Sequence, residues 1–377
     1  MKILIDGRLY GLENAGLGRY LNNLILELSR IDLKNEYVLL LRKKYFDSLK
    51  LPGNWKKVLA DFRHYSFKEQ VALPGLIKKE NPDLVHFPHF NVPIFYKGKY
   101  VVTIHDLLMH TQKGLLATTL PAPFYFVKRL GYKLGFNTAV KKSSAIIVPS
   151  LAVKNELEKE YKGISEKIYV TYEGLDEEIS NVDTVEIDSP YFVYTGNAYP
   201  HKNLKRLVQA MVLLNINRDE KIKLIITSAR NVFTSRLEKI INELKAEDFV
   251  KLLGFVPDKS LGSLYKNSLG FVFPSLSEGF GLPGLEAMNA GTPVLASEIP
   301  VFKEIYEKYA IYFNPLDFSS IERSMRDVIE MKESERKNLV EEGQKFAKRY
   351  SWVKMAKETL KIYEETAPKK ENSSCLR

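Results

Sequence analysis

The chain has 377 residues, of which 45% are hydrophobic and 27% charged, and its formal net charge is +10. This length exceeds the size at which one hydrophobic core stops growing, so it predicts two globular domains. A single cysteine, Cys375, excludes an intramolecular disulfide and a thiolate zinc cluster. No apolar run reaches the roughly 18 residues of a membrane span, and no secretory signal is visible, so we expect a cytoplasmic protein.

The positive charge is concentrated in the first 150 residues. They hold 23 Lys and Arg against 11 Asp and Glu, or +12, whereas residues 151–377 hold 33 against 35, or −2. Residues 123–136 interleave aromatic and basic side chains, which suits an anionic surface at the inner face of the cytoplasmic membrane. A buried helix whose rings pack in the core explains this stretch equally well. No nucleic-acid-binding module accompanies the charge.

Strands and helices alternate along the first half of the chain. Apolar patterns predict a strand, a helix and a second strand at residues 2–6, 18–31 and 37–41. Three short buried-type runs then predict strands at 84–87, 100–104 and 145–148. We therefore expect a parallel sheet flanked by helices in a first domain at residues 1–180.

The second half repeats this alternation. The polar segment 179–190 lacks periodicity and predicts a linker before a second domain at 188–350. After a strand at 191–196, further strands are expected at 223–227, 250–253, 269–273 and 293–296. A closing helix is expected at 351–366, with Ser351 as its N-cap and a disordered tail at 367–377.

Residues 277–288 carry the most specific motif of the chain, with two glycines between two glutamates. A helix pattern begins near Pro283, so residues 278–282 are expected to form a strand-to-helix loop. Gly279 and Gly281 would let an anion approach the loop amides. The positive end of the helix dipole favours a diphosphate at that place.

The two glutamates have different expected roles. Glu286 lies in the first turns of the helix, where its carboxylate would accept hydrogen bonds from a vicinal diol such as ribose. Glu278 lies on the loop, closer to a reacting sugar. An isolated glutamate in either place is more often a helix-start charge or a solvated residue. The packed helix-to-strand turn at 290–294 argues against a solvated Glu286.

Two loops of the first half follow strand ends, where such sheets bind ligands. Gly16 and Gly18 lie in the first loop and would let phosphate or acceptor approach the backbone, unless they are ordinary turn glycines. His105 ends the strand at 100–104, and a direct role in the site is favoured over a structural one. Asp106 is expected to orient His105 or to cap the next segment.

A third loop, at 196–204, follows the first strand of the second domain and contains Asn197 and Lys202. A lysine at a helix start opposes the helix dipole. A diphosphate bound there would remove that cost, because Lys202 would pair with the anion. Arg206 and Arg230 remain open as a second cation.

These motifs together resemble the retaining glycosyltransferases of family 4, which include bacterial mannosyl- and glucosyltransferases, and the match extends along nearly the whole chain. The resemblance implies an α/β fold called GT-B, with two facing Rossmann-like domains and a cleft between them. It implies that the first domain is the acceptor side, that the second holds most of the donor, and that the closing helix returns to the first domain. It implies that Glu278 and Glu286 bind the donor sugar and its ribose, and that Lys202 binds the diphosphate. It also implies that His105 assists an oxocarbenium-like state. The family usually has an arginine where this chain has Asn197, which leaves the second phosphate contact open.

The predicted site is therefore a nucleotide-sugar site without a metal, because no Asp-x-Asp pair ends a strand and the histidines have no metal-ligand spacing. The catalytic candidates are His105 and Glu278, and the donor-binding candidates are Gly16, Gly18, Asn197, Lys202, Gly279, Phe280, Gly281, Leu282 and Glu286.

The predicted function is retaining, metal-independent transfer of a hexose from a GDP- or UDP-sugar to a glycan or lipid-linked acceptor in cell-envelope or polysaccharide synthesis. No cofactor beyond the nucleotide sugar is expected. Lys202 and the loop amides would stabilise the leaving diphosphate. Front-side attack and double displacement through Glu278 are both open.

Three alternatives differ in what they need. A sugar-nucleotide epimerase or hydrolase of the same architecture would turn over donor without an acceptor. A non-catalytic basic module that binds lipid would need no nucleotide. A NAD-dependent dehydrogenase is disfavoured, because the first glycine loop lacks the full dinucleotide fingerprint and no acidic residue ends the second strand.

Overall fold

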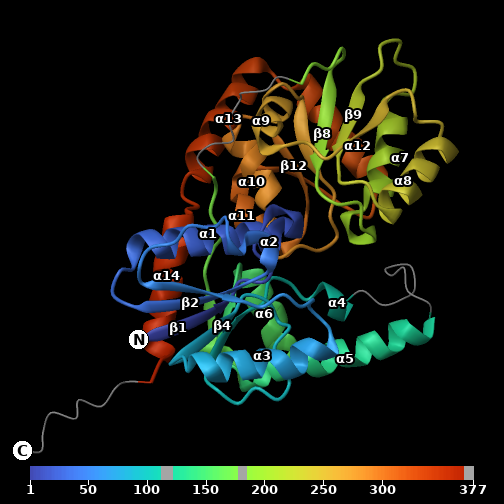
Figure 1. Cartoon of the computed structure of the whole chain (residues 1–377). Coiled ribbons are helices and arrows are strands. Elements are labelled where there is room, and N and C mark those ends of the chain that lie inside the picture. Colours follow the sequence, from blue (N-terminus) through green and yellow to red (C-terminus); the bar gives the residue numbers. More distant parts are fainter. Residues whose placement is uncertain (112–121, 177–184, 369–377) are drawn as a thin grey trace, which may run out of the picture. The chain divides into compact units, whose positions relative to one another are not determined.

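The computed structural model describes residues 1–111, 122–176 and 185–368. In this part of the chain, two compact α/β units are present, each with a parallel sheet and surrounding helices (Figure 1). The first unit contains residues 1–107, 122–173 and 352–368, and the second contains 108–111 and the described part of 174–351.

The first unit is built on a parallel sheet with the strand order β3-β2-β1-β4-β5-β6-β7. The strands are β1 (Lys2–Asp6), β2 (Glu36–Leu41), β3 (Trp55–Leu59), β4 (Leu84–Phe87), β5 (Tyr100–Thr103), β6 (Ala145–Val148) and β7 (Ile168–Val170). The sequence patterns missed β3 and β7. Both are edge strands, and two lysines interrupt the apolar run of β3, whereas β7 has only three residues.

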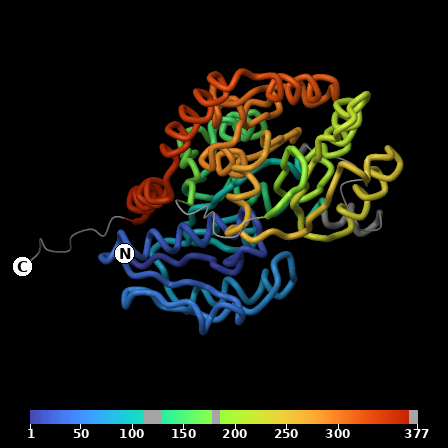
Figure 2. Tube along the Cα trace, turned by 90° about the horizontal axis from the view of Figure 1, so that it is seen from above, coloured from blue at the N-terminus to red at the C-terminus, as the bar shows by residue number. Residues whose placement is uncertain are grey.

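Helices cover this sheet. They are α1 (Ala15–Ile31), α2 (Lys43–Phe46), α3 (Phe67–Glu80), α5 (Ala122–Lys142), α6 (Leu151–Glu160) and α14 (Trp352–Thr366). The long helix α1 forms because its apolar residues recur every three or four positions and are buried on one face. The last helix, α14, lies beside α1, although most of the chain separates them in sequence (Figures 1 and 2).

Helix α1 begins at Ala15, so Gly16 and Gly18 lie in its first turn. The sequence analysis placed both glycines in a loop, and that prediction is wrong. A Cβ atom on Gly18 would lie 1.9 Å from the carbonyl oxygen of Gly11, so a glycine is needed there for packing. A Cβ atom on Gly16 would meet nothing within 4 Å.

The burial of side chains on α5 tests the two interpretations of its aromatic and basic sequence. Tyr132 and Phe136 are buried in the core, against Phe90, as the buried-helix interpretation requires. Leu130 and Leu134 are exposed instead. The side chains of 123–128, which carry the other aromatics of this stretch, lie outside the described residues.

The second unit contains a parallel sheet with the strand order β10-β9-β8-β11-β12-β13. Its strands are β8 (Tyr191–Thr195), β9 (Lys223–Thr227), β10 (Val250–Gly254), β11 (Gly270–Phe273), β12 (Val294–Ser297) and β13 (Ile311–Phe313). Its helices are α4 (Leu108–Thr111), α7 (Leu204–Leu214), α8 (Val232–Glu243), α9 (Asp258–Lys266), α10 (Leu282–Asn289), α11 (Pro300–Tyr306), α12 (Phe318–Glu330) and α13 (Glu333–Ala347).

Parts of the expected linker and tail, 177–184 and 369–377 with Cys375, lie outside the described residues. Within the described part of the chain, no helix combines the length and apolarity that crossing a bilayer requires.

Candidate active site

An ion pair marks the carboxyl edge of the second sheet. Lys202 lies after β8, in a short 3₁₀ turn (Pro200–Lys202), and Glu278 lies in the loop after β11. The Nζ atom of Lys202 is 2.5 Å from Oε1 of Glu278, and each side chain is only 12% exposed. The Leu276 amide also donates to the His201 carbonyl, at 2.8 Å, which joins the two loops. Two charges 76 positions apart in sequence are thus brought together.

The position of Lys202 corrects one step of the sequence argument. Helix α7 begins only at Leu204, and Asn203 precedes it in the left-handed conformation, with φ at 59°. The Nδ2 group of Asn203 donates to the carbonyls of Pro274 and Pro315, at 3.0 and 2.7 Å. The charge of Lys202 is already balanced by Glu278, so its place near a helix start does not by itself require a diphosphate.

Buried aromatic groups surround this ion pair. Burial raises the pKa of Tyr194 and Tyr306 well above the usual range, and the negative charge of Glu278 raises it further. Burial lowers the pKa of His201 to about 4, and the charge of Lys202 adds to that effect. These neighbours are therefore neutral at pH 7, and the ion pair holds the local charge.

The glycine loop before α10 is shaped by packing. Gly281 has φ at 104°, a conformation that favours glycine, and its Cβ would lie 2.5 Å from the Tyr306 hydroxyl oxygen. The same hydroxyl donates to the Gly281 carbonyl, at 2.5 Å. The ring of Phe280 packs edge to face against Tyr350. Gly281 is therefore required by the turn itself, whether or not a ligand approaches it.

Glu286 lies in the second turn of α10 and is only 5% exposed. The interpretation of Glu286 as a solvated helix residue is therefore wrong. Leu282 is buried at the start of the same helix, and Gly279 is half-buried in the loop beside Glu278. Asn197 shapes the other loop, because its backbone carbonyl accepts from the Tyr194 hydroxyl at 2.8 Å and its Oδ1 accepts from the Tyr199 amide at 3.3 Å.

His105 lies after β5 at the carboxyl edge of the first sheet. Its Nε2 is 3.1 Å from the carbonyl oxygen of Pro88, and because a carbonyl only accepts, Nε2 carries a proton. Its Nδ1 is 3.4 Å from Oε1 of Glu173, which follows β7. The ring meets Tyr20 edge to face, with 4.8 Å between centroids. Glu173 thus faces His105, a partner that the sequence analysis did not find.

A chain of buried hydrogen bonds ends at Tyr20, whose ring contacts His105. The Tyr363 hydroxyl of α14 is 2.6 Å from Nδ1 of His86, and Nε2 of His86 is 2.8 Å from Oγ1 of Thr103. The same Oγ1 is 3.1 Å from the hydroxyl of Tyr20, whose ring packs on His105. Burial lowers the pKa of His86 to about 3, so its ring is neutral and offers one donor and one acceptor to this chain.

A second buried cluster follows β1. Arg8 donates to Oδ1 and Oδ2 of Asp6 at 2.7 and 2.6 Å, and to Oε1 of Glu69 at 2.6 Å. Burial alone would raise the pKa of Asp6, but the charge and hydrogen bonds of Arg8 outweigh it and lower that pKa. The Asn91 amide also donates to Glu69, at 2.8 Å. The sequence signal that could have found this cluster is Asp6-Gly7-Arg8 directly after a buried strand.

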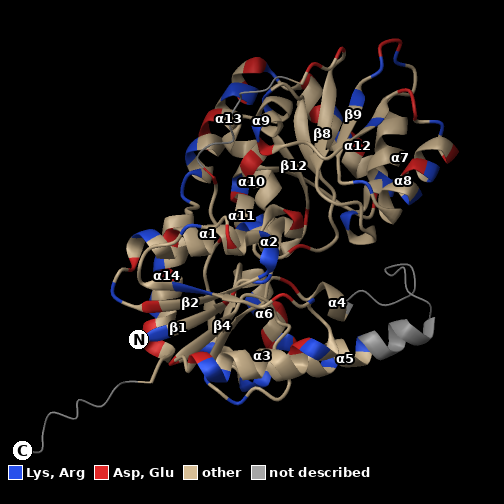
Figure 3. Ribbon diagram, viewed as in Figure 1, with Lys and Arg blue, Asp and Glu red and all other residues tan. Residues whose placement is uncertain are grey.

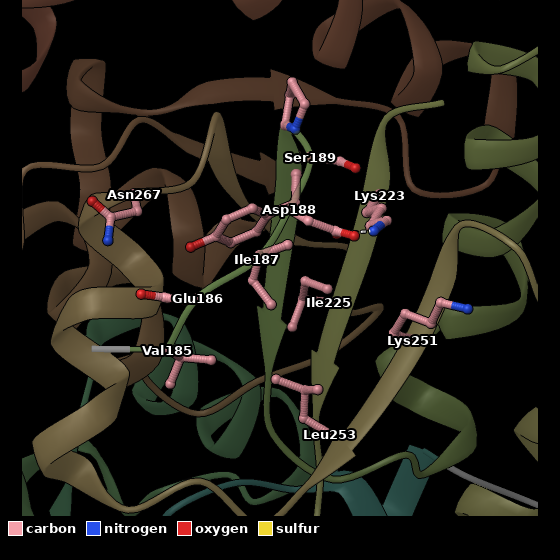
Figure 4. A pocket seen from close by; sticks show the side chains of 12 residues that line it. Val185, Glu186, Ile187, Asp188, Ser189, Lys223, Ile225, Lys251, Leu253 and Asn267 are labelled. Atoms are coloured by element: carbon pink, nitrogen blue, oxygen red, sulfur yellow. Dashed lines mark hydrogen bonds and ion pairs between the residues drawn. The ribbon is translucent and has the colours of Figure 1, made fainter. Parts of the chain in front are cut away.

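The larger of two described cavities has a volume of about 940 Å³ and lies in the second unit. Its lining includes Tyr191 and Lys223, the first residues of β8 and β9, as well as Asp188, which pairs with Lys223 (Figure 4). This cavity lies toward the amino ends of the two strands, whereas parallel sheets bind ligands at the carboxyl ends. It therefore differs from the site of Lys202 and Glu278. No group of three or more possible metal ligands gathers in the described residues.

Two family models match this chain. Residues 15–179 match the model of glycosyltransferase family 4, and residues 176–346 match that of glycosyl transferases group 1. The O-antigen chain mannosyltransferase RfbU of Salmonella typhimurium is 29% identical over 268 residues, which are 70% of each chain.

Solved structures show the same fold. A sucrose-phosphate synthase from Thermosynechococcus elongatus has a TM-score of 0.75 at 17% identity, covering 97% of this chain and 98% of the other. Anabaena HepE, solved in complex with UDP and glucose, has a TM-score of 0.72 at 18% identity, covering 97% and 100%. The two family models together span nearly the whole described chain, and the chain belongs to the family 4 glycosyltransferases of the GT-B fold.

Proposed function

We propose that this chain transfers a hexose from a nucleoside diphosphate sugar to a glycan or lipid-linked acceptor in polysaccharide synthesis, with retention of anomeric configuration and without a metal ion. The observation that carries the proposal is the half-buried ion pair of Lys202 and Glu278, next to the loop that leads to buried Glu286. The name of the RfbU relative suggests mannose as the sugar and O-antigen as the product class.

In this proposal, the diphosphate of the donor takes the place of Glu278 as the partner of Lys202. The lysine would then stabilise the negative charge that builds on the leaving group, together with amides of the glycine loop. Glu278 would be released to accept hydrogen bonds from the donor sugar. Glu286, held in place on α10, would bind the ribose diol.

The role of His105 is to stabilise positive charge near the sugar. Its Nε2 proton is committed to the Pro88 carbonyl, so its orientation is fixed before substrate arrives. The carboxylate of Glu173, 3.4 Å from its Nδ1, would add negative charge on the far side of the ring. His105 would thus contribute electrostatically, and the proton of the acceptor would go to a phosphate oxygen of the leaving group.

The direct test is a transfer assay with GDP-mannose and UDP-glucose as donors and a mannose-containing lipid-linked glycan as acceptor. We expect one donor to be consumed only when acceptor is present, at an unchanged rate in EDTA. Nuclear magnetic resonance of the product would show the same anomeric configuration as the donor. Consumption without acceptor would favour an epimerase or hydrolase, and loss of turnover in EDTA would contradict metal independence.

We also propose that the first unit binds an anionic membrane surface, where a lipid-linked acceptor would be presented. Exposed apolar residues lie on α3 (Phe67 and Val71) and on α5 (Leu130 and Leu134). Lysines and arginines lie along the same two helices (Figure 3). Apolar side chains among basic ones favour an anionic interface.

This part is tested by sedimentation with vesicles of phosphatidylglycerol or phosphatidylcholine. We expect binding only to phosphatidylglycerol, and weaker binding when Leu130 and Leu134 are both changed to serine. The matched control is Leu316→Ser, at an exposed leucine of the second unit. Equal binding of the double variant and the control would contradict the proposal.

A further inference from the structure

A second cavity, of about 360 Å³, lies in the first unit beside the start of α1. The residues that line it come from the segment after β1, from α1, and from α2 and the segment that follows it. They are Tyr10, Gly11, Leu12, Glu13, Asn22, Tyr45, Ser48 and Leu49. Two of the contributing segments follow the carboxyl ends of the adjacent strands β1 and β2, where parallel sheets bind ligands. The volume is within the range of small-molecule sites.

Three polar groups of this cavity have no hydrogen-bond partner in the described part of the chain. They are the Tyr10 hydroxyl, the Nδ2 group of Asn22 and the Ser48 hydroxyl. The Oδ1 atom of Asn22 is occupied, because it accepts from the Gly11 amide at 2.9 Å, and this bond directs the Nδ2 donors elsewhere. The two hydroxyls can donate or accept and the Nδ2 group donates, which suits a ligand rich in hydroxyls.

The charge of the cavity points to a neutral ligand. Its one charged lining residue, Glu13, binds the Lys44 ammonium at 2.8 Å and the Tyr45 hydroxyl. No lysine or arginine lines the cavity, so it offers no free cation to a phosphate. The rings of Tyr10 and Tyr45 lie 5.1 Å apart at 74° and supply apolar surface for the C–H groups of a sugar.

The wall of the cavity is fixed by interlocking backbone and side chains. Gly11 has φ at 116°, and a Cβ atom there would lie 2.2 Å from the Tyr45 hydroxyl and 2.5 Å from the Glu13 carboxylate. The carbonyl of Gly11 packs in turn against Gly18 of α1. Only glycine at position 11 allows Tyr45 and Glu13 to approach so closely, and the arrangement is set before any ligand arrives.

We propose that this cavity binds a neutral hexose unit of the acceptor glycan, an inference that rests on the proposed transfer function. The sugar hydroxyls would pair with Tyr10, Asn22 and Ser48, and its apolar face would lie against a tyrosine ring. The donor is a poor candidate for this cavity, because Lys202, Glu278 and Glu286 all belong to the other unit. The cavity would therefore select the acceptor sugar and leave donor binding unaffected.

The binding test uses saturation-transfer nuclear magnetic resonance with methyl α-D-mannopyranoside, methyl α-D-glucopyranoside and inorganic phosphate as probes. Ser48 is exposed, so Ser48→Trp fills the cavity without disturbing the core; Asp47→Trp adds the same bulk at an exposed neighbour that does not line it. We expect at least one hexoside to bind wild type and Asp47→Trp, with the signal lost in Ser48→Trp. Binding of neither hexoside, an equal signal in both tryptophan variants, or preference for phosphate would overturn the inference.

A kinetic test separates this inference from the proposed function. Ser48→Ala and Tyr10→Phe should each raise the KM for glycan acceptor about fivefold, the effect of one neutral hydrogen bond, with the KM for donor unchanged. Ser29→Ala, at a serine of α1 that does not line the cavity, is the matched control. If transfer occurs and Ser48→Trp leaves hexoside binding intact, the inference fails and the function stands. If the hexoside binds at Ser48 and no transfer occurs, the function fails and the binding site stands.

Discussion

The polar groups of the two units are organised differently at their sheet edges. In the second unit, one short segment, 278–286, supplies both glutamates, and a single ion pair joins it to Lys202. In the first unit, His105 is held by groups from separate strands and helices, which include Pro88, Glu173 and Tyr20. The second unit therefore has both glutamates in one motif, whereas the partners of His105 in the first unit come from segments far apart in the sequence.

This difference indicates a division of labour. In the second unit, an anionic ligand could replace Glu278 as the partner of Lys202, so the lysine would keep a negative charge beside it. The hydrogen bonds around His105 involve no such exchange of partners. They contribute by fixing the position of its ring. We therefore expect substitutions in the second unit to change donor affinity, and substitutions around His105 to change turnover.

The largest effect is expected for Glu286→Ala, which should weaken donor binding by about 3 kcal/mol, or roughly 150-fold, because two hydrogen bonds to a carboxylate are lost. Donor affinity would be measured by isothermal titration calorimetry. Glu286→Gln keeps the shape of the buried side chain and should lose less, whereas Glu342→Ala, at a partly exposed glutamate of α13, is the control. Unchanged affinity in Glu286→Ala would exclude ribose binding by this residue.

His105→Ala should lower kcat by about 100-fold, or about 2.7 kcal/mol, and change the donor Kd by less than about threefold. Single-turnover kinetics would separate the two quantities. His105→Gln retains an N–H donor for the Pro88 carbonyl and should recover part of the structure but not the turnover. If affinity falls as much as it does in Glu286→Ala, the proposed division between the units is wrong.

Lys202→Ala should weaken donor binding by about 2 kcal/mol, because a charge-assisted contact to the diphosphate is lost. It also leaves Glu278 without its cation in a half-buried place. The double variant Lys202→Ala/Glu278→Ala should therefore lose less affinity than the sum of the single variants, since the two residues are coupled. Strict additivity in this double-mutant cycle would contradict exchange of the ion pair.

Acid should destabilise the first unit through His86. Its pKa is about 3 in the folded chain, below the usual 6.5, so the unfolded chain binds more protons between these values. The contribution of His86 is thus complete above pH 6.5 and decreases by about 1.4 kcal/mol per pH unit as the pH falls toward 3. Chemical denaturation at several pH values would measure this slope. It should be smaller in His86→Gln, and an equal slope would refute the assignment.

Much of the fold followed from the sequence, because central strands of parallel sheets have continuous apolar runs that are visible in the chain. The edge strands β3, β7 and β13 were missed, because two lysines interrupt β3 and the other two have only three residues each. The helix start at Ala15 was missed too, since glycines at 16 and 18 disguise a first turn whose packing against Gly11 is a tertiary feature.

The residues of the candidate site were also predicted only in part. Glu278, Glu286 and Lys202 were predicted from local motifs, and the structure joins Lys202 to Glu278 directly. Glu173 and Tyr363 were not predicted, because each is distant in sequence from the histidine that it contacts, His105 or His86. The local sequence around a residue does not indicate such a distant partner. Their discovery needs the strand order of the sheet.

The central claim is that the second unit binds a nucleotide sugar, with Lys202 pairing with its diphosphate and Glu286 accepting hydrogen bonds from its ribose. The most direct measurement is a thermal-shift panel with UDP, GDP, ADP and NAD on wild type and Glu286→Ala, because a ligand that binds only the folded chain raises its apparent stability. The account predicts a rise in Tm with GDP or UDP alone, lost in Glu286→Ala. A rise with none of the four, or an equal rise in the variant, would contradict it.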